Sequence, residues 1–434
     1  MPRLTRDRTT WLTYAQLGLW GFFLYGFGPV VPLLRDEQGT SAAVAGLHST
    51  GIAVGALAGG ALFAPVARRF GRGPAVWLGL AGVAAGVTAL GVLRPLPATI
   101  AAVAVVATFG MMVISGVNVV LTARHGPAAP AALTEANAAC AGMGILAPLT
   151  IGATVDAGLG WRPVMAVEVG LITLVALAAL TFRVRTPQAA PAAAATGPLG
   201  ETPPLVPAAT AAVVGSRGLP DRHRTARPAP VRHPGPGGRI GSGRLPRAYW
   251  IAWVLMSVTG SIEVCLSLWT ADVLRTHAGL SAGGASAAVA AIVCGMFAGR
   301  VAGGRAALRW PPVPLLLGAL TVSLAGFALF WASPIGWLAV TGLVVLGLGN
   351  ALHYPLAISI ALAVAGTATD RAAGWSSYSM AVGFGIAPVV LGRVADGVGP
   401  HPAFLMLPGF IAVAVLLTVR LGRALPPFSA PGRG

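Results

Sequence analysis

Residues 147–156 read APLTIGATVD, and residues 387–396 read APVVLGRVAD. Both stretches follow the pattern A-P-x3-G-x3-D, and they lie 387 − 147 = 240 positions apart. Single alanine and glycine matches mean little in this composition, but a proline and an aspartate repeated at fixed distances from a glycine are much rarer. The same offset pairs Gly55 with Gly295, Gly59 with Gly299 and Arg69 with Arg309. The chain is therefore predicted to contain a duplicated unit.

The repeated unit is predicted to consist of membrane-spanning helices. Hydrophobic residues make up 56% of the 434 residues and charged residues only 9%, whereas a soluble domain has about 25% charged residues. An apolar run of about 17–25 residues is long enough to cross a bilayer as a helix. Twelve such runs lie near residues 11–34, 43–67, 75–93, 98–121, 131–155, 163–182, 249–274, 282–304, 313–332, 336–362, 373–397 and 402–420.

The repeat and the apolar runs together predict the architecture. We expect an all-α integral membrane protein whose twelve transmembrane helices form two six-helix bundles, residues 1–182 and 249–434. The segment between them, 183–248, is rich in Arg, Pro, Gly and Ala without an apolar period, which predicts a linker. Parallel repeats of this kind are a transporter architecture, in which the substrate binds near the middle of the membrane between the halves.

The placement of arginine predicts the orientation in the membrane. The sequence contains no lysine, so its 29 basic residues are all arginine. With the N-terminus inside, 24 arginines fall in cytoplasmic segments and 5 outside, or 14 against 5 without the ten in 183–248. Because positive residues accumulate on the cytoplasmic side, both termini and the linker are expected there. We expect a monomer in the plasma (inner) membrane.

Residues that the chain lacks exclude several function classes. Without lysine there is neither a P-loop nor a Schiff-base site. The cysteines, Cys140, Cys265 and Cys294, have no disulfide or metal-ligand spacing. Residues 279–283, GLSAG, fit the G-x-S-x-G hydrolase elbow, but they follow a predicted membrane helix where that motif requires a strand. The linker 183–248 carries 10 − 2 = +8 of the net charge of +17, so nucleic acid is not an expected partner. We expect no enzyme activity, cofactor or metal.

The loop after the second span carries a recognisable motif. Arg69, Gly71 and Arg72 match the pattern G-x-x-x-D-R-x-G-R-[RK], with Arg68 at the usual aspartate position. Arg300 and Arg305 stand in the corresponding glycine-rich helix end and basic loop of the second half. With the twelve spans and the 6+6 repeat, the sequence resembles the major facilitator superfamily. The resemblance implies that the following residues belong to the cytoplasmic gating loops: Arg68, Arg69, Gly71, Arg72, Arg300 and Arg305.

The fifth span and its repeat allow two interpretations. Pro148 and Gly152 partly match the antiporter pattern of the same family, G-x-x-x-G-P-x-x-G-G, which slightly favours export. The alternative is structural: Pro148 and Pro388 kink their helices, while Gly152 and Gly392 permit close helix packing.

Glu263 is the acid nearest the middle of a predicted span, within SVTGSIEVCLSLW. A charged side chain at the bilayer centre costs about 2.5–3.5 kcal/mol on insertion scales, so it is a functional candidate by default. Such a carboxyl is suited to taking up and releasing a proton. The alternative is a structural carboxylate bonded to a neighbouring helix. Glu168, nearer the end of the sixth span, is a weaker candidate.

The tenth span contains the polar sequence GLGNALHYP. Its spacing puts Asn350 on one face with either His353 or Tyr354. His353 is a candidate proton relay, and a buried histidine with satisfied hydrogen bonds is the alternative. The family resemblance implies that the first, fourth, seventh and tenth helices line the cavity. The substrate-binding candidates are therefore Tyr25, Trp269, Asn350, His353 and Tyr354, with packing as the alternative for the aromatic residues.

These observations predict a secondary transporter that moves a small organic molecule across the lipid bilayer by alternating access. Proton coupling is expected through Glu263 or His353, because no nucleotide site supplies the energy. An uptake permease or a facilitator is the alternative within transport. A membrane sensor that does not transport is the alternative from a different class.

Overall fold

The computed structural model describes residues 4–182, 245–307, 309–365 and 369–424, and these residues form helices and connecting turns without a strand. The first half contains α1 (Arg8–Gln38), α2 (Ala42–Phe70), α3 (Arg72–Val92), α4 (Leu96–His125), the 3-10 helix η1 (Gly126–Ala128), α5 (Ala129–Asp156) and α6 (Arg162–Thr181). The second half contains α7 (Arg247–His277), α8 (Ala282–Ala288), α9 (Ala290–Ala307), α10 (Pro312–Ala332), α11 (Gly336–Asn350), α12 (His353–Ala365), α13 (Thr369–Val398), α14 (Pro400–Ala403) and α15 (Met406–Ala424).

These helices supply twelve candidate membrane spans over the described residues, which confirms the predicted all-α membrane fold. Three spans are interrupted, since α8 with α9, α11 with α12 and α14 with α15 each form one crossing. Most of the predicted linker, 183–248, lies outside the described residues, and α7 begins at Arg247 within its last positions.

The break in the tenth span follows from Pro355. Proline has no backbone N–H, so it cannot donate to the carbonyl oxygen of Ala351 one turn earlier. At this point the backbone tightens, and the Leu352 N–H donates to the carbonyl of Gly349 at 3.2 Å, a three-residue spacing. The span therefore turns between Asn350 and His353, in the middle of the polar sequence.

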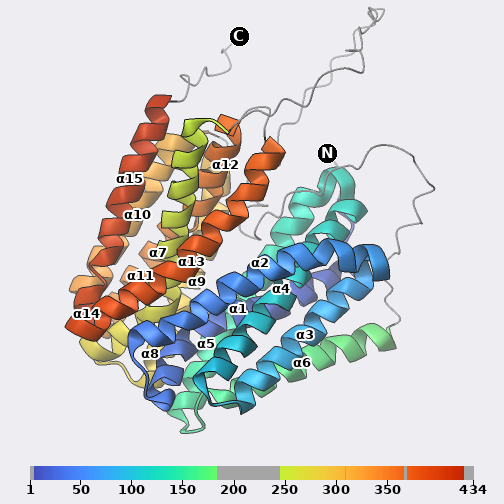
Figure 1. Ribbon diagram of the computed structural model, residues 1–434, viewed down its shortest axis with the longest axis horizontal. Helices are drawn as coiled ribbons and strands as arrows, with labels where there is room; N and C mark the ends of the chain where they lie inside the picture. The colour runs from blue at the N-terminus through green and yellow to red at the C-terminus, as the bar shows by residue number, and fades with distance from the viewer. Residues whose placement is uncertain (1–3, 183–244, 308, 366–368, 425–434) are drawn as a thin grey trace, which may run out of the picture.

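The two halves form two groups of helices that converge at one end of the molecule and diverge toward the other (Figure 1). Burial identifies the central helices. In the most apolar window of α1, 83% of the residues are buried, and 78% are buried in that of the α11–α12 span, compared with 22% for α6. The first and tenth spans therefore lie at the centre, and α6 lies at the periphery.

The bundles contact each other at the end formed by the α1–α2 and α7–α8 connections, which we call the closed end. Arg35 forms an ion pair with Asp272, and Arg275 forms one with Asp36 at 2.9 Å. Both pairs join α1 to α7. Because α1 runs toward this end and α15 runs away from it, the start of α1 and the end of α15 lie on the opposite side.

The two aspartates of the repeated pattern cap helices of the opposite bundle. Asp396 on α13 accepts hydrogen bonds from the backbone N–H groups of Ala42 and Ala43, at 2.7 and 3.1 Å, where α2 begins. Asp156 on α5 accepts from the hydroxyl of Ser281, the N-cap of α8, at 2.9 Å. A carboxylate is favoured at a helix N-terminus, so each bundle stabilises a helix start in the other.

The repeated glycines allow the same helices to approach closely. A Cβ added to Gly152 would lie 2.6 Å from the carbonyl oxygen of Gly283 on α8. One added to Gly392 would lie 2.5 Å from the carbonyl oxygen of Ala42 on α2. Only glycine fits such backbone contacts, so both positions bring the bundles together at the closed end.

Candidate functional site

Five side chains from both bundles meet near the middle of the molecule, and we call them the central cluster. Arg300 on α9 interacts with the hydroxyl of Tyr25 on α1 and with the carboxylate of Glu263 on α7. Cys140 on α5 lies within electrostatic range of Arg300, and Tyr354 on α12 lies within range of Glu263. Because α1 and α5 belong to the first bundle and the other three helices to the second, the cluster crosses the interface between them.

Three polar residues of the central cluster are partly exposed. Tyr25, Glu263 and Arg300 are each partly exposed, whereas the residues that flank Glu263, Ile262 and Val264, are buried. Glu263 lies halfway along the 31-residue helix α7. The Glu263 carboxylate therefore lies at mid-helix depth, and neither it nor the Arg300 guanidinium is fully covered by the surrounding residues.

The position of Arg300 corrects its assignment to a cytoplasmic loop. Arg300 lies inside α9, seven residues before that helix ends at Ala307, or about 10 Å at 1.5 Å per residue. The 240-residue offset gives the same result, because it pairs Arg300 with Gly60, which lies inside α2. Arg305 is also within α9, and its side chain lies outside what the structure describes.

The three polar residues of the tenth span point to three different neighbours. The amide nitrogen of Asn350 contacts the sulfur of Met296 on α9 at 3.9 Å. The ring of His353 is buried, with its Nε2 3.1 Å from the Ser323 hydroxyl on α10. Tyr354 alone reaches the central cluster. His353 is thereby placed within the second bundle, away from Glu263.

Several buried polar atoms near the centre have no hydrogen-bond partner among the described residues. They include the indole nitrogen of Trp269, the hydroxyl of Tyr354, Nε of Arg300 and the side-chain oxygen of Asn350. Trp269 lies on α7 six residues beyond Glu263 and is 1% exposed. Buried polar groups in proteins normally have partners, so this set identifies a region suited to a polar ligand or water.

The basic residues around the α2–α3 connection lie in the last turn of α2 and at the first position of α3. Arg68, Arg69 and Arg72 are exposed, and Arg69 lies over the ring of Phe70, 5.6 Å from its centroid. Gly71 between them has φ +91°, a conformation that side chains other than glycine rarely adopt. No ion pair involves these arginines in the described part of the chain.

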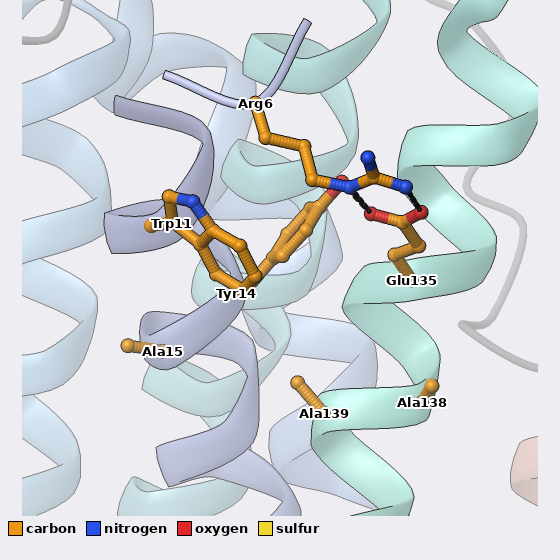
Figure 2. A pocket seen from close by; sticks show the side chains of 7 residues that line it. All are labelled: Arg6, Trp11, Tyr14, Ala15, Glu135, Ala138 and Ala139. Atoms are coloured by element: carbon orange, nitrogen blue, oxygen red, sulfur yellow. Dashed lines mark hydrogen bonds and ion pairs between the residues drawn. The ribbon is translucent and has the colours of Figure 1, made fainter. Parts of the chain in front are cut away.

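A second polar group, which the sequence patterns did not indicate, lies around the start of α1, opposite the closed end. Figure 2 shows Arg6 pointing toward Glu135 there. The Nε of Arg6 donates to Glu135 at 2.9 Å, and the Tyr14 hydroxyl donates to the same carboxylate at 3.1 Å. The hydrogen bond from Arg6 to Glu135 raises the pKa of Arg6. The group borders a pocket of about 590 Å³ lined by Arg6, Trp11, Tyr14, Ala15, Glu135, Ala138 and Ala139.

Glu168 is fully buried in α6, and neither of its carboxylate oxygens has a hydrogen-bond partner among the described residues. Helix α6 packs against α1, α3 and α5, all in the first bundle. Glu168 is therefore remote from the interface that the central cluster crosses. No group of three or more His, Cys, Asp or Glu side chains in the described residues is arranged to hold a metal ion.

The sequence matches the family model of the Major Facilitator Superfamily over residues 17–388. The chain belongs to this superfamily. It is therefore a multi-pass membrane protein of a transporter family rather than an enzyme. No curated protein matches the sequence significantly.

Solved structures of superfamily members share the fold. A bacterial homologue of the human lysosomal transporter Spinster, inward-facing and unoccupied, matches with a TM-score of 0.68 and 14% identity over 97% of this chain and 98% of that one. The nucleoside transporter NupG matches with a TM-score of 0.66 and 12% identity over 96% and 98%. FucP in the outward conformation matches with a TM-score of 0.53 and 15% identity over 95% and 98%.

Proposed function

We propose that this superfamily member is a proton-coupled secondary transporter of a small organic solute, with Glu263 as the proton-carrying group. The observation that supports this proposal is the central cluster itself. It brings together a carboxyl group, a guanidinium and two phenols, with contributions from both bundles. In a two-bundle transporter, a site formed by both bundles is exposed to each side in turn.

The division of the cluster between the bundles supports alternating access. Glu263, Arg300 and Tyr354 all belong to the second bundle and move together. Tyr25 and Cys140 belong to the first. Rocking the bundles apart at the closed end changes the distance from Tyr25 to Arg300 and Glu263, so the surroundings of the carboxylate differ between the two states. This difference is what couples proton binding to conformation.

The arginine distribution supports a particular orientation of the protein in the membrane. The closed end then faces away from the cytoplasm, and both termini and the linker lie inside, with the protein as a monomer in the plasma membrane. Gly152, on which the export interpretation depended, packs against α8 at the closed end. That contact supports a role for the fifth span in gating. It gives no support to the interpretation of Gly152 as a sign of export.

A compound screen that reports proton movement tests the proposal. Proteoliposomes are loaded with a pH-sensitive dye, and each solute of a chemical panel is added outside at equal pH. A transported solute should change the internal pH with the wild-type protein. Glu263→Gln preserves the shape and removes the titrating group, so it should abolish that signal while preserving exchange of the labelled solute.

Glu168→Gln is the matched control, because it makes the same change in a helix remote from the cluster. It should leave the proton signal intact. Wild-type proton movement in Glu263→Gln, or its loss in Glu168→Gln alone, would refute the assignment of Glu263 and redirect attention to α6.

A further inference from the structure

The formal charge of the central cluster depends on a single proton. Arginine remains protonated in proteins, and cysteine and tyrosine are neutral near pH 7 in their ordinary state. Glu263 and Arg300 therefore sum to zero when the carboxyl is ionised and to +1 when it carries a proton. The titratable groups that interact with Glu263 in the described residues are Arg300 from α9, Tyr25 from α1 and Tyr354 from α12.

Arg300 has unused capacity to bind an anion. It interacts with Glu263, yet no side-chain nitrogen–oxygen contact within 4.0 Å joins it to an acid in the described part of the chain. Its Nε has no hydrogen-bond partner there. A guanidinium presents five donors in a planar fork that matches a carboxylate in two parallel hydrogen bonds. An arginine within the membrane without a bonded counter-ion is unfavourable in free energy. Binding of an anionic ligand to Arg300 would therefore be favourable.

We propose that the solute is a small organic monocarboxylate, bound by Arg300 with the Tyr25 hydroxyl as a further donor, and that it enters together with one proton on Glu263. This proposal rests on the proton-coupled transport proposed above. The proton binds a carboxylate oxygen of Glu263 and neutralises it. The electrostatic attraction between Glu263 and Arg300 is then lost. The solute carboxylate then takes the place of Glu263 as the counter-ion.

The charge balance gives the transport stoichiometry. The empty cluster carries Glu263 as −1 and Arg300 as +1. The loaded cluster carries neutral Glu263, Arg300 as +1 and the solute as −1. Both sums are zero, so one cycle moves no net charge through the centre. Transport is therefore driven by a pH gradient and is insensitive to the membrane potential.

Matched acid and amide pairs test this recognition before the solute itself is identified. The thermal unfolding midpoint of the full-length protein in detergent is measured with benzoate and benzamide, nicotinate and nicotinamide, and lactate and lactamide, at pH 6 and pH 8. The acids should stabilise the wild type, the amides should not, and the effect should be larger at pH 6. Arg300→Gln should weaken binding of the acids at least tenfold, and Arg300→Lys should retain part of it.

Two variants separate recognition from general charge effects. Arg309→Gln removes an exposed arginine just beyond α9 and should bind the acids as the wild type does. Glu263→Gln imitates the protonated carboxyl and should bind them equally at both pH values. Absence of acid-selective stabilisation in the wild type, or its persistence in Arg300→Gln, overturns the assignment.

Transport of the best-binding acid in proteoliposomes tests the stoichiometry. Uptake should follow an imposed pH gradient and should not respond to a potassium–valinomycin potential. A response to the potential overturns the electroneutral balance. Proton-driven flux of a neutral solute together with failed acid binding would leave the proposed function standing and reject the substrate class. Acid binding without any flux would do the reverse.

Discussion

Replacing Gly392 with alanine should loosen the closed end without weakening either bundle. An alanine Cβ would lie 2.5 Å from the carbonyl oxygen of Ala42, and ordinary contact begins near 3.4 Å, so α13 and α2 must separate by about 3.4 − 2.5 = 0.9 Å. Overpacking of this kind costs about 1–3 kcal/mol. Within α13 the same change is favourable by about 1 kcal/mol, because alanine is a better helix former than glycine. The penalty therefore falls on the contact between bundles.

A penalty of about 1–3 kcal/mol reduces the population of the closed arrangement about 5- to 150-fold relative to the open one. Pulsed electron-electron spin resonance measures this shift directly. Spin labels are attached at Leu159→Cys and Ile335→Cys, two exposed residues in the α5–α6 and α10–α11 connections, in a protein without its native cysteines. The wild type should show a short distance, and Gly392→Ala should transfer population to a longer one.

Gly170→Ala is the control, because it makes the same substitution in α6, where an added Cβ meets nothing within 4 Å. It should raise the thermal unfolding midpoint slightly and leave the distance distribution unchanged. If Gly392→Ala gives the wild-type distribution, or if Gly170→Ala broadens it equally, close packing at Gly392 does not hold the closed end.

Three further outcomes are expected. Asp396→Ala removes the acceptor for two backbone N–H groups of α2, a loss of about 1 kcal/mol, so the same label pair should report a shift of about fivefold. Asp156→Ala should shift it less, because Asp156 accepts from the Ser281 hydroxyl and from no backbone N–H of α8 among the described contacts, and equal shifts would contradict this reasoning. Deleting about 40 residues within 190–240 should preserve membrane insertion and transport, and failed insertion would show that the segment is structural. A reporter inserted at residue 215 should be active only in its cytoplasmic form, and activity outside would reverse the topology.

Long apolar runs and the repeat were sufficient to predict the fold. Lipid leaves a backbone little choice except the helix, so run length alone located the twelve spans. The repeated pattern also placed Asp156 and Asp396 at corresponding helix ends. What the pattern did not give was the partner of each aspartate, since a hydrogen bond across two bundles depends on how they pack.

Local patterns were less informative for the central cluster. The sequence G-R-V-A-G-G-R around Arg300 is typical of a basic helix end, and its true depth depends on α9 continuing to Ala307. Helical spacing placed Asn350 on one face with either His353 or Tyr354, but the turn imposed by Pro355 lies between Asn350 and both of them. His353 and Tyr354 are separated by about 100° around a helix axis, and only packing decides which of them lies toward Glu263.

Both copies of the duplicated unit contain residues that join the bundles at the closed end, whereas the charged residues of the central cluster lie only in the second copy. Several residues of the closed end have counterparts 240 positions apart, as Ser41 and Ser281 show by capping the starts of α2 and α8. The central cluster breaks this symmetry, because the counterparts of Arg300 and Tyr354 are Gly60 and Ile114. A symmetric closed end lets the bundles separate and rejoin as equal halves. Because Glu263 and Arg300 both belong to the second bundle, they keep a fixed separation during that motion, so in the mechanism proposed above the proton and the solute bind side by side on one rigid surface while the first bundle opens or covers it.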